Sequence, residues 1–226
     1  MTEKNDWIKA PIWDEWRELT RLQWSGRIAF QAEAERWHSP YIAGKESMSV
    51  RISDCGARYM TSLENHLRTI EDHTHFCSLI LNRSYSLVES HSKLATYIVE
   101  NGNWGAYKSG VTEEEQDEVD AIELGGGIKS WASDLLRKTD QSWSQVYKGR
   151  KGLVEVSIVR NALTHGYSRV TPHLAARAAA DGCSLPFAVG APISVDFALL
   201  HEYRGRMKSF CRIVSDGVVR KHRGLC

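Results

Sequence analysis

Arg160 and His165 are the residues whose types and spacing are best suited to chemistry on a phosphate. A histidine exchanges protons near neutral pH, so His165 could move the proton of a ribose 2′-hydroxyl or of a leaving 5′-oxygen. An arginine could grip the phosphate between these two oxygens. Asn161 lies one helical turn before His165, where it could orient the imidazole or a phosphate oxygen. This chemistry would require no metal ion.

The helix that must position these residues is predicted to be buried and to end at Gly166. Apolar residues cover most of the helical surface between residues 153 and 163, and Gly166 lies where a C-terminal cap is expected. Arg160 interrupts this run, although a guanidinium is rarely buried without an anionic partner or a function. Residues five positions apart on an ideal helix are rotated by about 140°, so Arg160 and His165 come together only if the helix ends between them.

The start of this helix is predicted at Ser142, which is a favourable N-cap residue. Three basic residues would then lie partway along the helix, and we expect them to contact RNA: Lys148, Arg150 and Lys151.

A purely structural interpretation of the motif stays open at this point. Arg160 could pair with a buried carboxylate such as Glu155 or Glu89, because ion pairs in helical cores are often structural. His165 could simply cap the C-terminus of the helix, where a cation is favoured.

Two further clusters resemble binding sites at first sight. His73 and Cys77 are four residues apart and would share a helix face, whereas His75 would point away. Two ligands without a third do not make a metal site, so we expect no metal here. The run Gly125–Gly127 before Lys129 lacks the spacing of a phosphate-binding loop and follows no clear strand, so we interpret it as a hinge.

Composition places the chain among ordinary globular proteins. Of its 226 residues, 42% are hydrophobic and 25% are charged, and the net charge of +1 argues against bulk attraction to nucleic acid. The five cysteines form no CxxC pair, which suggests reduced thiols and a cytoplasmic location. We expect neither a signal peptide nor a membrane segment, because no apolar run is long enough.

Apolar spacing predicts an all-α protein, an up-and-down helical bundle with a tryptophan-rich helical extension at its N-terminus. We expect two units, residues 1–56 for the extension and residues 57–226 for the bundle, with an irregular linker at 38–56. The helices are predicted at residues 12–37 as one or two helices, 57–100 as one helix or two that share an axis, after Thr112, and at 128–137, 172–180 and 195–220.

The extension carries five of the eight tryptophans, all before residue 38. They could form a platform on which bases stack. We favour a docked arm, because tryptophan contributes a large area to cores and interfaces.

The residues from Arg160 to His165 resemble the RNxxxH form of the motif of the HEPN superfamily, and with Tyr167 they also fit its longer RxxxxHxY pattern. The long helix around residues 81–90 is similar to the first bundle helix of that superfamily, which often carries an acidic residue near its middle. Glu89 is the matching residue here. The resemblance covers roughly residues 60–220 in helix order.

This resemblance implies a dimeric all-α bundle in which the motifs of two subunits meet and form a metal-independent endoribonuclease site, with no cofactor. Arg160 would bind the scissile phosphate, His165 would act as general acid or base, and Asn161 and Glu89 would support them. Such ribonucleases are commonly toxins or defence effectors. In one group a partner nucleotidyltransferase silences the toxin by adenylylating the motif tyrosine, whose position Tyr167 occupies. A catalytically inactive dimer that binds nucleotide or a protein partner in the same cleft is the alternative.

Overall fold

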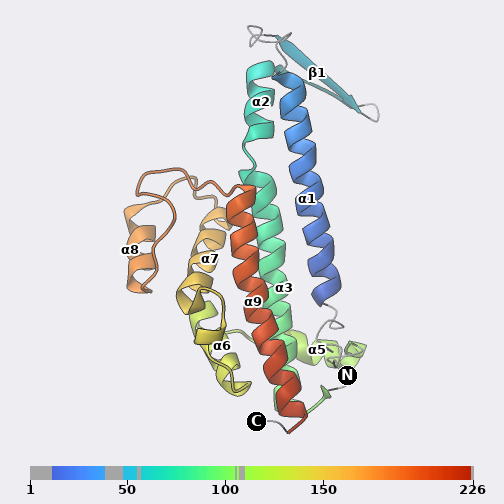
Figure 1. Ribbon diagram of the computed structural model, residues 1–226, viewed down its shortest axis with the longest axis vertical. Coiled ribbons are helices and arrows are strands. Elements are labelled where there is room, and N and C mark those ends of the chain that lie inside the picture. The colour runs from blue at the N-terminus through green and yellow to red at the C-terminus, as the bar shows by residue number, and fades with distance from the viewer. Residues whose placement is uncertain (1–11, 39–47, 55–56, 105, 107–109, 225–226) are drawn as a thin grey trace.

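The protein is mostly helical, and a computed structural model describes residues 12–38, 48–54, 57–104, 106 and 110–224 (Figure 1). Long helices stand side by side, and shorter elements lie along one side and at both ends of them. The helices are α1 (Ile12–Trp37), α2 (Leu63–Glu71), α3 (Thr74–Asn101), α5 (Glu113–Ala121), α6 (Gly127–Lys138), α7 (Gly149–Thr164), α8 (Pro172–Ala180) and α9 (Phe197–His222).

Helices α3 and α9 form the centre of the bundle and run in the same direction. His73 lies against Phe197 at one end, with ring centroids 4.7 Å apart. His91 and Ser215 lie 3.2 Å apart further along the same two helices. Both helices therefore descend together in Figure 1, and the intervening elements return the chain to the starting end.

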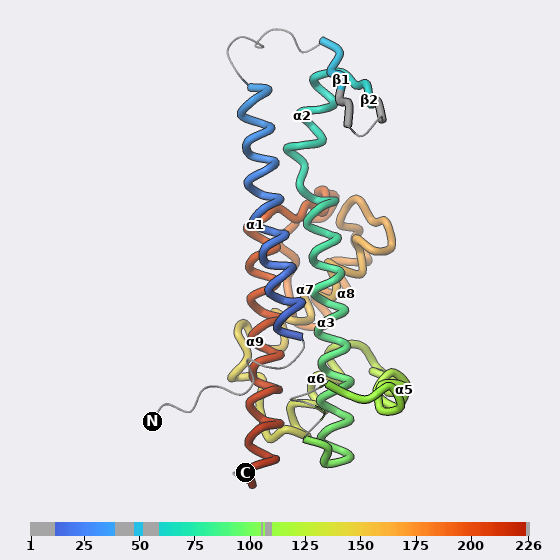
Figure 2. The backbone as a smooth tube through the Cα atoms, turned by 90° about the vertical axis from the view of Figure 1, so that its right-hand side faces the viewer, coloured from blue at the N-terminus to red at the C-terminus, as the bar shows by residue number. Residues whose placement is uncertain are grey.

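Helices α1 and α7 run opposite to this central pair. On α1, Glu15 pairs with Arg83 and Phe30 lies against Phe76, so residue numbers rise on one helix as they fall on the other. On α7, residues 157 and 160 meet residues 85 and 82 in the same inverse order. The four longest helices therefore alternate in direction along the chain, as Figure 2 shows for α1, α3 and α9.

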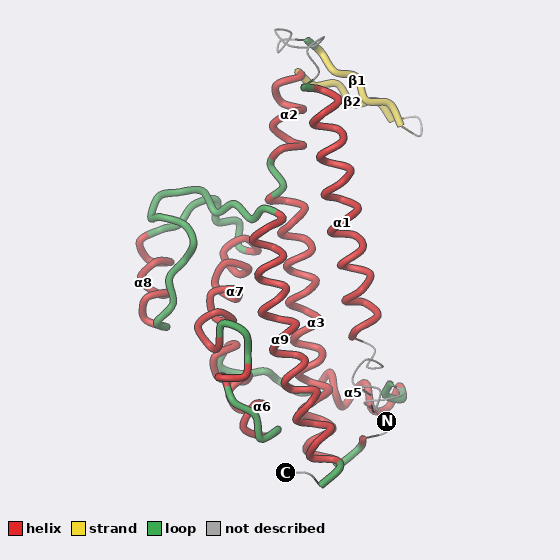
Figure 3. Tube along the Cα trace, in the orientation of Figure 1, coloured by secondary structure: helices red, strands yellow, loops and turns green. Residues whose placement is uncertain are grey.

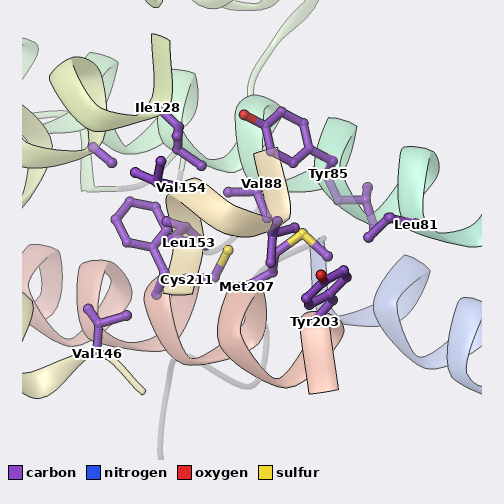
Figure 4. Packing of buried hydrophobic residues seen from close by; sticks show 14 of the residues in the cluster. Leu81, Tyr85, Val88, Ile128, Val146, Leu153, Val154, Tyr203, Met207 and Cys211 are labelled. Carbon is purple, nitrogen blue, oxygen red and sulfur yellow. The ribbon is translucent and has the colours of Figure 1, made fainter. Parts of the chain in front are cut away.

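The core lies where α3, α7 and α9 meet, and α6 closes one side of it. Figure 4 shows its side chains interdigitating from these four helices. Because each helix buries one apolar face against the others, the core is continuous, with these members among the most buried: Leu81, Val88, Leu135, Leu153, Leu200, Tyr203, Met207 and Phe210.

The structure contains a β-hairpin at one end of the molecule, which the sequence analysis did not predict. Strand β1 (Ser49–Asp54) pairs antiparallel with β2 (Ala57–Ser62), in a register that places Ser49 opposite Ser62 and Asp54 opposite Ala57 (Figure 3). The apolar and polar alternation of residues 50–53 has the period of a strand, which the interpretation of residues 38–56 as an irregular linker overlooked. The predicted boundary between residues 56 and 57 falls inside this hairpin.

For residues 57–100, predicted as one helix or two that share an axis, the structure has two helices, and the first begins only after the hairpin, at Leu63. Ser62 caps α2, since its hydroxyl accepts from the backbone N–H of Asn65. Helix α2 ends at Glu71. The carboxylate of the next residue, Asp72, accepts a hydrogen bond from the backbone N–H of Thr74, the first residue of α3. Figure 2 shows α2 and the hairpin extending beyond the start of α9, alongside the second half of α1.

In the described part of the expected extension, α1 is one continuous helix that docks on the bundle. Trp13 and Trp16 are buried, so they are not available for stacking on bases. The buried Arg204 of α9 donates to Gln23 Oε1 at 2.6 Å and to the Trp16 carbonyl at 3.1 Å, and its guanidinium lies over the Trp16 ring. Among the tryptophans of α1, Trp37 is partly buried and Trp24 is exposed, with 48% of its surface accessible, whereas Trp7 lies outside the described residues.

The shorter helices follow their capping residues. Thr112 forms a capping box with Glu115 at the start of α5, and Thr171 caps α8 with Pro172 in its first turn. Among the described residues, no helix is both long and apolar enough to cross a membrane.

Candidate functional site

The helix that carries the motif begins later than predicted and ends as predicted. Ser142 caps only a short 3₁₀ helix, Trp143–Gln145, and α7 starts at Gly149 after Lys148 adopts a left-handed conformation with φ 62°. A left-handed residue and a glycine interrupt the helical path here, which explains the later start. The C-terminal end agrees with the sequence, because Gly166 has φ 74°.

The end of α7 is a Schellman motif. The backbone N–H of Tyr167 donates to the Ala162 carbonyl at 2.9 Å, and that of Gly166 donates to the Leu163 carbonyl at 3.1 Å. These two bonds fix the direction in which the chain leaves the helix. His165 is therefore the C-cap residue, one position after the last residue of α7.

Arg160 is half-buried and is held by neutral partners. Its Nε donates to Asn82 Oδ1 at 3.1 Å, and a terminal nitrogen donates to Asn161 Oδ1 at 2.9 Å. The guanidinium carbon lies 4.9 Å from the centroid of the Tyr85 ring, a cation–π distance. The Tyr85 hydroxyl is fixed in turn by a 3.0 Å hydrogen bond to Ser157. The arginine is thus oriented by direct contacts with uncharged groups.

The structural interpretation in which Arg160 pairs with Glu155 is wrong. Glu155 pairs with Arg206 at 2.9 Å and accepts from the Tyr203 hydroxyl at 3.0 Å, so it ties α7 to α9 on another face of the helix. Glu89 does not form an ion pair with Arg160 among the described residues either, although it lies close enough for the two charges to interact. Burial raises the pKa of Glu89, and the nearby Arg160 opposes that shift.

Asn161 has a different partner from the one expected. Its side-chain oxygen orients Arg160 rather than the imidazole of His165. The residue that the sequence reasoning missed is Asn82, whose oxygen also lies 3.0 Å from the hydroxyl of Thr164. Asn82, Tyr85 and Glu89 are three and four residues apart and share one face of α3, which is the signal that could have identified them.

His165 and Tyr167 lie at the surface beyond the end of α7. The His165 side chain makes no hydrogen bond or ion pair to any residue that the structure describes. Tyr167 is 48% exposed. Within one chain, therefore, the imidazole is free to engage a ligand or a second copy of the protein.

The basic residues expected to contact RNA lie at the other end of α7. Arg150 precedes Arg160 by ten residues, which corresponds to about 15 Å along a helix axis. Lys148, Arg150 and Lys151 are all exposed, so they remain accessible to a ligand. The structure does not bring them together with Arg160 and His165 in one chain.

A pocket of about 450 Å³ adjoins the motif between α3, α6 and α7. The glycine run contributes to it, because Gly126 and Gly127 line the pocket where α6 begins. Arg160 and Asn161 line it from α7, and Glu89 from α3. The pocket has both apolar walls and charged groups, as ligand sites commonly do.

His73 and Cys77 are packed among other side chains of the structure. His73 lies between Phe30 and Phe197, and Cys77 is fully buried with its pKa raised to about 12 by desolvation. No group of three or more metal-binding side chains gathers anywhere in the described part of the chain. Comparison with known protein families, curated proteins and solved structures finds no match to this chain.

Proposed function

We propose that this protein is a metal-independent endoribonuclease of the HEPN type, with an active site formed by two copies of the chain. The proposal rests on the motif Arg160 to His165 and on the helical bundle that carries it. In each copy, Arg160 would bind the scissile phosphate and His165 would transfer a proton.

The observation that supports it best is the environment of Arg160. A half-buried guanidinium is costly to keep, and cations in such places usually face a carboxylate. Here the hydrogen-bonding partners are the amide oxygens of Asn82 and Asn161, and the ring of Tyr85 lies beneath. These contacts fix its orientation and leave its positive charge available for an anion, which is what phosphate binding requires.

The reaction would be an internal transesterification. The 2′-oxygen forms a bond to phosphorus while the bond from phosphorus to the 5′-oxygen breaks. One imidazole accepts the proton of the 2′-hydroxyl, and an imidazolium donates a proton to the departing 5′-oxygen. Arg160 would stabilise the negative charge that builds up on the phosphate oxygens in between. The Asn82 and Asn161 amides would act as positioning residues.

Two histidines would let one imidazole act as the base while the other acts as the acid, and one chain presents only one histidine in this motif. A two-fold axis near the exposed end of α7 would supply the second imidazole and a second arginine. The exposure of His165 and the free state of its side chain within the described chain are compatible with such an assembly.

The test is RNA cleavage in the presence of a chelator. We expect the wild-type protein to cut RNA under these conditions, and Arg160→Ala and His165→Ala each to reduce the rate at least about 100-fold. His201→Ala removes an exposed histidine of α9 and serves as the matched control, with no loss expected. Equal rates in all four proteins would refute the proposal.

Mixing the two inactive variants tests the composite site. A mixed dimer of Arg160→Ala and His165→Ala retains one intact arginine and one intact histidine on different chains. We expect part of the activity to return on mixing, and sedimentation to give twice the chain mass of 25.6 kDa. A monomer, or a mixture as inactive as its components, would exclude a site shared between chains.

Binding without catalysis is a second candidate, favoured by the pocket beside Arg160. In that case nucleotide would bind in a manner that depends on Arg160, and RNA would stay intact. The ribonuclease proposal extends to a toxin or defence effector in the cytoplasm, with the free thiols of Cys77, Cys183 and Cys211 supporting a reducing compartment. The exposed Tyr167 is accessible to a nucleotidyltransferase antitoxin, if the chain has such a partner.

A further inference from the structure

The lining of the pocket between α3, α6 and α7 is mainly polar, and it combines charged groups with a few apolar side chains. Tyr85, Ile128 and Val154 contribute from three different helices, as the labels in Figure 4 show. The buried Trp131 adds a large flat side chain. With about 450 Å³, the pocket has room for a small planar ligand such as a nucleobase, whose hydrogen-bonding groups could meet the polar lining.

Two of the charged groups neutralise one another. Lys129 and Asp181 form an ion pair at 3.0 Å across the rim. Arg160 remains as the oriented cation described above, and Arg177 remains as an exposed one. Glu89 is left as the acidic group of the pocket that has no cationic hydrogen-bonding partner among the described residues.

The carboxylate of Glu89 has unused hydrogen-bonding capacity. It accepts no hydrogen bond from any described residue, although it is half-buried and its pKa is raised by desolvation. The nearest basic residue on its own helix, Lys93, donates instead to the carbonyl of Asp120. A partly desolvated carboxylate without donors is unfavourable unless a ligand supplies them.

A carboxylate accepts two parallel hydrogen bonds and donates none, which selects among the bases. Guanine presents two adjacent donors on its pairing edge, the ring N1–H and the exocyclic amine. Adenine and cytosine each place one amine beside a ring nitrogen that accepts, and uracil places one N–H between two carbonyls. Guanine is thus the RNA base whose edge matches a carboxylate at both positions.

We propose that this pocket binds a guanine base of the RNA, with the Glu89 carboxylate accepting from N1–H and the exocyclic amine while Arg160 holds the adjoining phosphate. This inference rests on the proposed ribonuclease function for its substrate, and it makes that enzyme selective for guanine beside the cut. Glu89 becomes a specificity-determining residue rather than a support for His165.

Calorimetric titration of the wild-type protein with nucleotide monophosphates tests the pocket without any mutation. We expect 5′-GMP to bind at least about tenfold more tightly than 5′-AMP, because AMP cannot satisfy both carboxylate oxygens. 5′-IMP keeps the N1–H and lacks the amine, so its affinity should lie between the two. Equal affinities for GMP and AMP, or no binding of either at millimolar concentrations, would overturn the proposal.

Variants then assign the selectivity to Glu89. Glu89→Gln keeps the size of the side chain but replaces one acceptor with a donor, so the advantage of GMP over AMP should disappear. Glu114→Gln changes an exposed carboxylate of α5 and should leave that advantage unchanged. A GMP preference that persists in Glu89→Gln would show that another group reads the base.

The experiments distinguish a failure of the base-pocket proposal from a failure of the ribonuclease proposal. GMP selectivity without RNA cleavage would remove the catalytic proposal and keep the base pocket. RNA cleavage that depends on Arg160 and His165, without GMP selectivity, would keep the enzyme and remove the base pocket.

Discussion

His91 is a histidine kept neutral in the centre of the bundle, on α3 two residues after Glu89. Only 2% of its surface is exposed, and Ser215 lies 3.2 Å from its Nε2. Burial lowers the pKa of His91 to about 4, and a hydrogen bond to the backbone of Cys211 opposes that shift in part. The unfolded chain therefore binds a proton at this residue in a pH range where the folded protein does not.

We expect this difference to destabilise the protein in acid. The contribution of neutral His91 to the free energy of unfolding is complete above about pH 6.5, the ordinary pKa of histidine. It is lost as the pH falls toward 4. The loss should be on the order of 3 kcal/mol of unfolding free energy. Urea unfolding at several pH values measures it.

The matched variants are His91→Gln and His201→Gln. Acidic residues also titrate in this range, but they are common to all three proteins, so the difference from wild type isolates the histidine. The curve of His91→Gln should be flatter between pH 6.5 and 4, whereas the exposed His201 should have little influence. Identical slopes for wild type and His91→Gln would contradict the assignment.

At the scale of the element, the end of α7 depends on one backbone conformation. Gly166 adopts φ 74°, which an alanine occupies only at a cost of about 1 kcal/mol. We expect Gly166→Ala to lose about that much stability and also to slow RNA cleavage, because the Schellman bonds position His165. Chemical denaturation and the cleavage assay measure the two effects.

Gly205 in α9 provides a control, because its substitution by alanine should change stability in the opposite direction. It is exposed within a helix, its φ is not positive, and no atom outside its own helical backbone lies within 4 Å of the place that a Cβ would take. Gly205→Ala should raise stability by about 0.5–1 kcal/mol and leave cleavage unchanged. A Gly166→Ala protein as stable as wild type would remove the backbone argument.

The sequence predicts those elements whose ends are marked by local chemistry. Thr171 with Pro172 gives the bounds of α8, and Gly166 gives the end of α7. The hairpin could not be recognised in the same way, because each strand is short and its pairing joins residues on either side of a predicted boundary. A periodicity that continues through Asp72 left open whether one helix or two follow, and it did not locate the break before α3.

The sequence predicted the motif residues of the candidate site, but it did not predict which residues they contact. Arg160 and His165 stand out as residue types, but the partner that holds Arg160 is Asn82, 78 residues earlier. No local pattern reports such a contact, since it depends on how α3 and α7 pack. The shared face of Asn82, Tyr85 and Glu89 becomes informative only when that face is known to meet α7.

At the scale of the whole molecule, the docking of α1 is tested by its tryptophans. Trp16 is 3% exposed and Trp24 is 48% exposed on the same helix. We expect Trp16→Ala to cost about 3–5 kcal/mol of unfolding free energy, because it leaves a cavity and removes the ring beneath Arg204. Trp24→Ala should cost less than about 1 kcal/mol. Equal losses in urea unfolding would show that α1 is not held by its buried face.

The same attachment has a consequence for biosynthesis. Gln23 of α1 and Arg204 of α9 bond to one another across 181 residues of chain. At about 5–20 residues per second, roughly 10–35 s separate the synthesis of the two partners on a ribosome. During that interval Trp13 and Trp16 have no α9 to pack against, so the nascent chain displays the apolar face of its first helix until its last helix emerges.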